Sequence, residues 1–183
     1  MTPYKLTEET KTTTSGITLY RIELTEDCDW GKAGTKGGWI ENESNLIEDA
    51  WIADNAQVYG NAIVSGRARV SGDAWVADDA QVYDNAQVFD GALVFGRSHV
   101  SGRARISDGA HVCGDAWVAG CAYVCGNAWV SGNAQVFGNA RVSGGAQVYG
   151  NAQVFGRAQV SGRSQVYGRS QVYGGGHVGF LGK

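Results

Sequence analysis

The sequence predicts an all-β fold, a single-stranded parallel β-helix (β-solenoid) of about eight coils, and three observations lead to it. An aliphatic residue falls at every sixth position from Ile40 to Val178 without a break, which makes 24 repeats. A small residue, usually Ala, lies two positions before each aliphatic residue. Gly or an acidic residue lies two positions after it in nearly every repeat.

The repeat Ala-x-Val-x-Gly-x corresponds to one short strand followed by one corner. Residues two apart on a strand point to the same side, so Ala and Val share the inner face. Gly tolerates the left-handed backbone that turns the chain. Six residues cannot bury a hydrophobic face alone, so successive coils must stack with parallel strands. Each buried Val contributes roughly 1.5–3 kcal/mol, which predicts a continuous aliphatic core.

Residues 1–38 lack the six-residue period and are predicted to form an N-terminal cap. Within them, Ile17 to Leu24 alternates apolar and polar residues, as expected of a strand with one buried face. Tyr4 to Leu6 is predicted to pair with this strand as a short hairpin, and Lys11 to Gly16 is predicted to be a polar loop. A cap is needed because the first coil would otherwise present unpaired backbone groups.

Residues 39–178 form the predicted β-helix, and the Gly-rich run from Gly31 to Gly38 leads into it. Residues 179–183 are the C-terminal tail, in which Phe180 and Leu181 are expected to fold over the last coil. Pro occurs once in the chain, at Pro3, so it interrupts no internal strand.

Composition and charge narrow the function classes. The net charge of −3 gives no global attraction to nucleic acid or to an anionic membrane. No apolar run has the length of a spanning helix, and the first residues do not resemble a secretory signal. We therefore expect a soluble protein in the cytoplasm, which is the host cytoplasm if a phage encodes it.

The N-terminal block carries a family resemblance. Leu19 to Leu24, Lys32 to Ile40, Asn45-Leu46 and the Gly-Asn-Ala-x-Val units resemble a family of phage- and prophage-encoded hexapeptide-like repeat proteins. Its members are known as hypothetical proteins or are assigned as hexapeptide-repeat acyltransferases. The resemblance covers almost the whole chain and implies a left-handed β-helix of triangular section. It implies no established activity, because the acyltransferase assignment rests on fold analogy.

With three repeats per coil, residues 18 apart stack in columns about 4.8 Å apart, and the outward side chains divide among three faces. The first face is the most aromatic. Because such a stripe is costly to leave in water, we predict that it forms a homo-oligomer, a dimer or a trimer. Its predicted interface residues are Trp39, Trp75, Leu93, Phe95 and Trp129.

The third face is small and basic. Its predicted basic edge consists of Arg69, Arg105 and Arg141 in one column and Arg67, Arg103 and Arg157 in the neighbouring corner column. Guanidinium groups suit carboxylates and phosphates, so an acidic protein surface or a nucleotide-like ligand would complement this edge. In the alternative interpretation, these arginines occupy solvated positions and balance nearby acidic residues such as Asp73, Asp108 and Asp115.

The sequence predicts no catalytic residue, no metal site and no cofactor. His99, His111 and His177 fall in three different columns, so they cannot converge within one chain. Cys113, Cys121 and Cys125 also lie in separate columns, Cys28 lies in the cap, and the chain has no Cys-x-x-Cys element. No insertion interrupts the repeats, so no loop is left to shape an acyl-donor site.

Three function classes stay open. The first is a non-enzymatic phage-type accessory protein, a rigid scaffold that binds a host or phage protein and inhibits it in the case of a host target. The second is a hexapeptide-repeat acyltransferase with a site between subunits. The third is a virion fibre or spike component. Binding of acetyl-coenzyme A would distinguish the second class from the other two.

Overall fold

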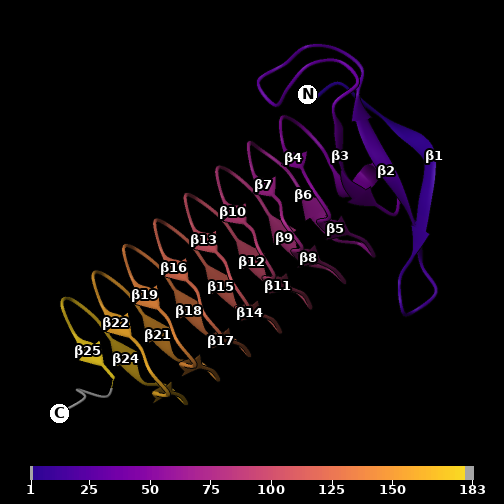
Figure 1. The fold of residues 1–183 in the computed structure, drawn as a ribbon. Helices are drawn as coiled ribbons and strands as arrows, with labels where there is room; N and C mark the ends of the chain where they lie inside the picture. The colour runs from indigo at the N-terminus through magenta and orange to yellow at the C-terminus, as the bar shows by residue number, and fades with distance from the viewer. Residues whose placement is uncertain (1, 180–183) are drawn as a thin grey trace.

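The computed structural model describes residues 2–179 and shows a three-sided β-solenoid of about eight coils, closed at its N-terminal end by a β-hairpin (Figure 1). The coils follow one another along a straight rod, from the hairpin in indigo to the last coil in yellow. The predicted all-β parallel solenoid is therefore confirmed.

Each face of the rod is one sheet, and the strands of a sheet follow one another along the rod. The first face comprises β1 (Tyr4–Thr12), β2 (Thr18–Leu24), β3 (Lys36–Ile40), β5 (Gln57–Val58), β8 (Trp75–Val76), β11 (Leu93–Val94), β14 (His111–Val112), β17 (Trp129–Val130), β20 (Gln147–Val148) and β23 (Gln165–Val166). The second face comprises β6 (Ile63–Val64), β9 (Gln81–Val82), β12 (His99–Val100), β15 (Trp117–Val118), β18 (Gln135–Val136), β21 (Gln153–Val154) and β24 (Gln171–Val172). The third face comprises β4 (Trp51–Ile52), β7 (Arg69–Val70), β10 (Gln87–Val88), β13 (Arg105–Ile106), β16 (Tyr123–Val124), β19 (Arg141–Val142), β22 (Gln159–Val160) and β25 (His177–Val178).

The strands of the coils pair in parallel with partners 18 residues apart, as in Gln57 with Trp75 and Val58 with Val76. The hydrogen bonds that flank them run in one direction, because the N–H of one coil donates to a carbonyl of the next. For example, the N–H of Trp75 donates to the carbonyl of Ala92 at 3.0 Å. The 18-residue period deduced from the sequence is thus the register of the structure.

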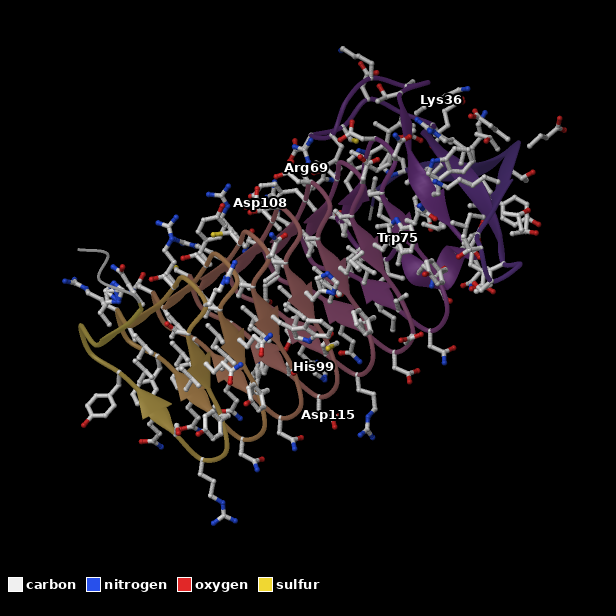
Figure 2. All side chains as sticks on the ribbon, turned by 60° about the horizontal axis from the view of Figure 1, so that its bottom comes forward. Lys36, Arg69, Trp75, His99, Asp108 and Asp115 are labelled. Atoms are coloured by element: carbon white, nitrogen blue, oxygen red, sulfur yellow. The ribbon has the colours of Figure 1, made fainter. Side chains whose placement is uncertain are left out.

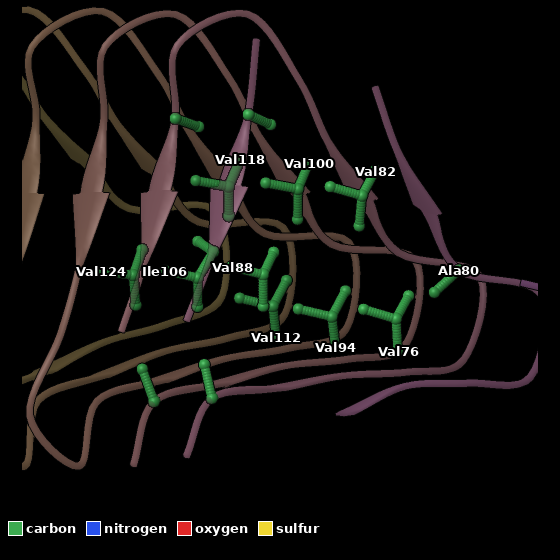
Figure 3. Packing of buried hydrophobic residues seen from close by; sticks show 14 of the residues in the cluster. Val76, Ala80, Val82, Val88, Val94, Val100, Ile106, Val112, Val118 and Val124 are labelled. Carbon is green, nitrogen blue, oxygen red and sulfur yellow. The ribbon is translucent and has the colours of Figure 1, made fainter. Parts of the chain in front are cut away.

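The core is a column of small and branched aliphatic side chains along each face. Val76, Val94 and Val112 of the first face point inward toward Val82, Val100 and Val118 of the second and toward Val88, Ile106 and Val124 of the third (Figure 3). All of these side chains are fully buried, as are the Ala residues that precede them. The predicted aliphatic core is therefore confirmed.

The corners use a device that the sequence interpretation missed. Most corner residues are Gly at positive φ, but Glu48, Asp54, Asp78, Asp84, Asp90 and Asp108 take the same conformation, with φ of 57–61°. In five of these, the carboxylate accepts a hydrogen bond from the N–H of the Gly 18 residues later. These pairs are Glu48–Gly66, Asp54–Gly72, Asp78–Gly96, Asp84–Gly102 and Asp108–Gly126. An acidic corner therefore stabilises the corner of the next coil.

The cap differs in detail from the prediction. β1 extends to Thr12, so the hairpin is longer than expected and the loop that was predicted from Lys11 begins at Thr13. β2 pairs antiparallel with both β1 and β3. Because β3 runs from Lys36 to Ile40, the boundary predicted at residue 38 falls inside a strand. The hairpin is long because it continues the sheet of the first face beyond the first coil.

The cap also closes the carbonyl end of the rod. Since coil-to-coil donors point toward the C-terminus, the carbonyls of the first coil need donors from outside the repeat. The Thr2 hydroxyl donates to Ala50 at 2.9 Å, and the Trp30 indole N–H donates to Asp49 at 2.8 Å. The Tyr4 hydroxyl contacts the carbonyls of Glu43 and Leu46 at 3.1 and 3.0 Å. These side chains replace the preceding coil.

The first coil departs from the outward columns that the repeat predicts. Asn45, in the 3₁₀ helix η1 (Glu43–Asn45), is buried, and its amide donates to the carbonyls of Gly60 and Ala62. Trp51 is buried as well, packed near Ile22 and Gly37. A Cβ on Gly37 would lie 2.6 Å from Ile22 and 2.7 Å from Trp51, so glycine lets the cap close over this coil.

Phe180 and Leu181, which were expected to fold over the last coil, lie outside the described residues. Within residues 2–179, no helix is long and apolar enough to cross a membrane.

Candidate interaction surfaces

The first face presents its aromatic residues in the middle of the rod. Trp75 and Trp129 are 39% and 43% exposed, while Leu93 and Phe95 between them are partly buried. Trp39 lies elsewhere: it is only 7% exposed, because the hairpin places Lys11 4.5 Å and Arg21 4.9 Å from its ring. The prediction that Trp39 belongs to an exposed interface is therefore wrong, and the strip begins at Trp75.

Two hollows of similar construction lie on the first face. One, of about 210 Å³, is lined by Trp75, Ala77, Leu93 and Phe95 among others. The other, of about 310 Å³, is lined by Trp129, Ser131, Gln147 and Tyr149. In each, a Trp precedes a small residue, and the coil that follows carries a larger pair. The strip is therefore recessed at two places rather than flat.

An aromatic cluster separates the two hollows. The ring of His111 stacks on Trp129, with 5.0 Å between ring centroids, and meets Phe95 edge-on at 6.5 Å. The Nδ1 atom of His111 is buried with no hydrogen-bond partner in the described residues. The Trp129 indole N–H contacts Cys113 Sγ at 3.2 Å, and burial of Cys113 raises the pKa of its thiol. Residues 95–129 thus form the apolar centre of this face.

A repeated contact explains why these aromatic residues are only partly exposed. A large ring leans back over the small side chain 16 residues earlier, in the preceding coil. Trp117 donates to Ser101 at 3.3 Å, and the hydroxyls of Tyr123 and Ser107 share a hydrogen bond of 2.9 Å. Trp129 covers Cys113 in the same way. The small residues beneath are buried because the next coil shields them.

The second face ends in two regular columns. The amides of Gln135, Gln153 and Gln171 are linked by hydrogen bonds of 3.2 and 2.9 Å. Beside them, the rings of Phe137, Phe155 and Tyr173 stack with centroid separations of 5.0 and 5.5 Å. Identical residues 18 apart therefore satisfy one another along the axis.

The third face carries the predicted basic edge. All six arginines are exposed, and Arg69 and Arg105 line one hollow of about 300 Å³ with Asp54 and Asp90. The Arg105 guanidinium lies between the rings of Phe89 and Tyr123, at 5.1 and 5.3 Å from their centroids. Arg141 lies 5.2 Å from the Tyr123 ring, and Arg67 pairs with Asp29 of the cap at 2.9 Å. Aromatic rings and acidic residues thus share this edge with the arginines.

Charge is separated along the rod, which the sequence interpretation overlooked. All 18 acidic residues lie in residues 1–115, together with ten basic ones, giving a net charge of −8. Residues 116–183 contain five basic residues and no acidic residue, giving +5. This signal was readable from the sequence, but the overall net charge of −3 conceals it.

The histidines and cysteines form no common centre. His99, His111 and His177 lie on the second, first and third faces, as their columns predicted. Cys113 and Cys125 are buried on the first and third faces, and Cys121 is exposed at a corner. Among residues 2–179, no three His, Cys, Asp or Glu side chains are grouped closely enough to hold a metal ion.

Comparison with known families identifies the repeat. Residues 56–72, 134–150 and 146–162 match the model of the YdcK β-solenoid repeat. The search of curated proteins returned no match. The matched segments contain the Ala-x-Val-x-Gly units whose strands stack in the structure. The chain is therefore a β-solenoid built from repeats similar to those of YdcK.

Proposed function

We propose that this chain is a non-enzymatic accessory protein of the phage type, whose solenoid offers a rigid surface for binding proteins, itself included. A host protein held and thereby inhibited by the rod is the predicted partner. The phage context rests on the family resemblance of the N-terminal block. The scaffold role rests on the stacked coils.

The exposed aromatic side chains carry this proposal. Trp75, Trp117 and Trp129 are each 39–48% exposed on a rod whose Ala and Val core needs none of them for stability. Large apolar side chains that share one face favour a protein interface, because removing them from water contributes about 25 cal/mol per Å². We assign self-association to the first face, through Trp75, Leu93, Phe95 and Trp129.

Light scattering tests the self-association. We expect a mass corresponding to two or more chains of 19.4 kDa at low micromolar concentration. The double variant Trp75→Ala with Trp129→Ala should shift the mass to that of one chain, while Trp117→Ala on the second face should not. A wild-type mass of one chain would contradict this assignment.

Capture from a host lysate tests the partner. A protein held by the wild-type rod and lost with a variant of the first face or of the basic edge would support the proposal. The triple variant of Arg69, Arg105 and Arg141 to Ser tests the edge, and salt should weaken a contact made there. Acetyl-coenzyme A binding measured by calorimetry would instead favour the acyltransferase alternative.

A further inference from the structure

We infer that two copies of this chain pair antiparallel through their first faces, with the middle of each rod at the two-fold axis. This inference rests on the self-association proposed above and adds the orientation and register. It is carried by the charges that border the first face and by the position of its aromatic centre.

The two corner edges of the first face change sign along the rod. The edge shared with the third face carries Asp54, Asp73, Asp90 and Asp108 and then Arg163, and the edge shared with the second face carries Asp78, Asp79 and Asp115, interrupted by Arg97, and then Arg169. Figure 2 shows Asp108 and Asp115 at two different edges of the rod. Both edges are therefore acidic toward the cap and basic in the last coils.

A two-fold axis parallel to the strands turns one rod end to end over the other. Each edge then faces the same edge of the second copy in the opposite direction. Arg163 comes to lie near Asp54 and Asp73, and Arg169 near Asp78 and Asp79. Parallel rods would instead place acidic edges against acidic edges, which repel at short range. Charge complementarity therefore selects the antiparallel arrangement.

The cap sets the register of this pairing. Trp39 lies under the hairpin, so the free part of the first face extends from Gln57 to Gln165. Pairing these ends places His111 at the axis, with Leu93 opposite Trp129 of the second copy and Trp75 opposite Gln147. The aromatic cluster of residues 95–129 is then buried against itself. Asp115 also lies near the axis, but it is already paired with Arg97 at 2.8 Å.

The two hollows of the first face fit the same register. The hollow at Trp75 lies two coils to one side of His111, and the hollow at Trp129 begins one coil to the other side. In the antiparallel pair, each hollow faces the other hollow of the second copy. Trp129 from one rod can then enter the recess beside Leu93 and Phe95 of the other.

Cross-linking of single cysteines tests the orientation. Gln57→Cys and Gln165→Cys are made separately in a chain in which Cys28 and Cys121 are replaced by Ser, and each is treated with a short bismaleimide. Facing sheets lie about 10 Å apart, whereas residues 57 and 165 of one chain are about 29 Å apart along the rod. We expect covalent dimers when the two variants are mixed and none from either variant alone.

The other outcomes are separable. Dimers from each variant alone would overturn the inference in favour of parallel rods. A light-scattering mass of two chains without any cross-link would place the interface on another face. A mass of one 19.4 kDa chain would contradict the proposed self-association itself. Gln81→Cys and Gln159→Cys, on the second and third faces, serve as controls that should not cross-link.

Charge reversal provides an independent readout. Arg163→Glu with Arg169→Glu should weaken dimerisation about tenfold or more, and added Asp73→Arg and Asp79→Arg should restore it by reversing the complementary edges. Arg103→Glu with Arg157→Glu makes the same change of charge on the corner away from the first face and should leave dimerisation unchanged. A failure of the four-residue variant to recover, while it stays folded, would overturn the charge pairing.

Discussion

In the coils that carry Trp117 and Trp129, exposed rings lean over small side chains of the preceding coil, whereas from Gln135 to Tyr173 the rings stack on one another. The interior is the same in both regions, with fully buried Ala and Val up to Val160. The difference shows that the core does not dictate the exterior. Repeated identical residues satisfy each other along the axis, while mixed coils leave hollows that a partner can fill.

The largest expected effect tests the shared interior. Val118→Asp puts an unpaired charge into a fully buried position and should cost several kcal/mol, about 3–5. Val172→Asp, in the last described coil, should cost much less because that side chain is only partly buried. Circular dichroism and thermal melting measure both. Equal melting temperatures for Val118→Asp and the wild type would show that the inward register is wrong.

A corner substitution compares a central coil with a late one. Gly102→Ala forces Ala into a φ of +67° and places its Cβ 2.9 Å from the carbonyl oxygen of Gly120, so we expect a loss of about 2–4 kcal/mol. Gly168→Ala has a similar φ of +66° but no atom within 4 Å, and should lose only about 1 kcal/mol. Denaturant unfolding gives both values, and similar losses would refute crowding as the cause.

A pH titration separates the capped end from the rest of the rod. Burial, together with the charge of Glu43, raises the pKa of Tyr4 from 10.0 to about 12. The folded state therefore favours the neutral phenol, so its stabilising effect is complete below pH 10 and is lost as the pH rises toward 12. Hydrogen exchange should show opening around residues 43–52 in this window before the coils at residues 135–154 open.

Tyr4→Phe is the matched variant for this titration. It removes the hydroxyl from two carbonyls and should cost about 1 kcal/mol near neutral pH. In this variant, the alkaline opening of residues 43–52 should become weaker. Unchanged alkaline opening would show that another group controls it.

The smallest expected effect concerns the leaning rings. Cys121 is exposed and should react readily with a thiol reagent, while Cys113 lies beneath Trp129, where burial also raises its thiol pKa. Trp129→Ala should accelerate the reaction of Cys113 about tenfold with little loss of stability. Trp117→Ala uncovers Ser101 instead and should leave Cys113 unchanged. Equal acceleration by both variants would mean general loosening of the coils.

The sequence predicted the coils well because each Ala and Val has the same neighbours 18 residues away, so period alone determines burial. Prediction failed at the first coil, where Trp39, Asn45 and Trp51 follow the repeat but the cap covers them. Their burial depends on a hairpin of no regular period, which pairs with β3 through contacts distant in sequence. The acidic corners were missed, although an acidic residue followed by Gly 18 positions later was readable.

The register of 18 residues has a consequence for how such a gene can change. Loss or gain of eighteen codons removes or adds one complete coil and returns every later residue to its own face. A change of six codons also preserves the aliphatic core, but it rotates all later columns by one face. Length can therefore vary by whole coils in evolution, while the faces that meet a partner are inherited unchanged.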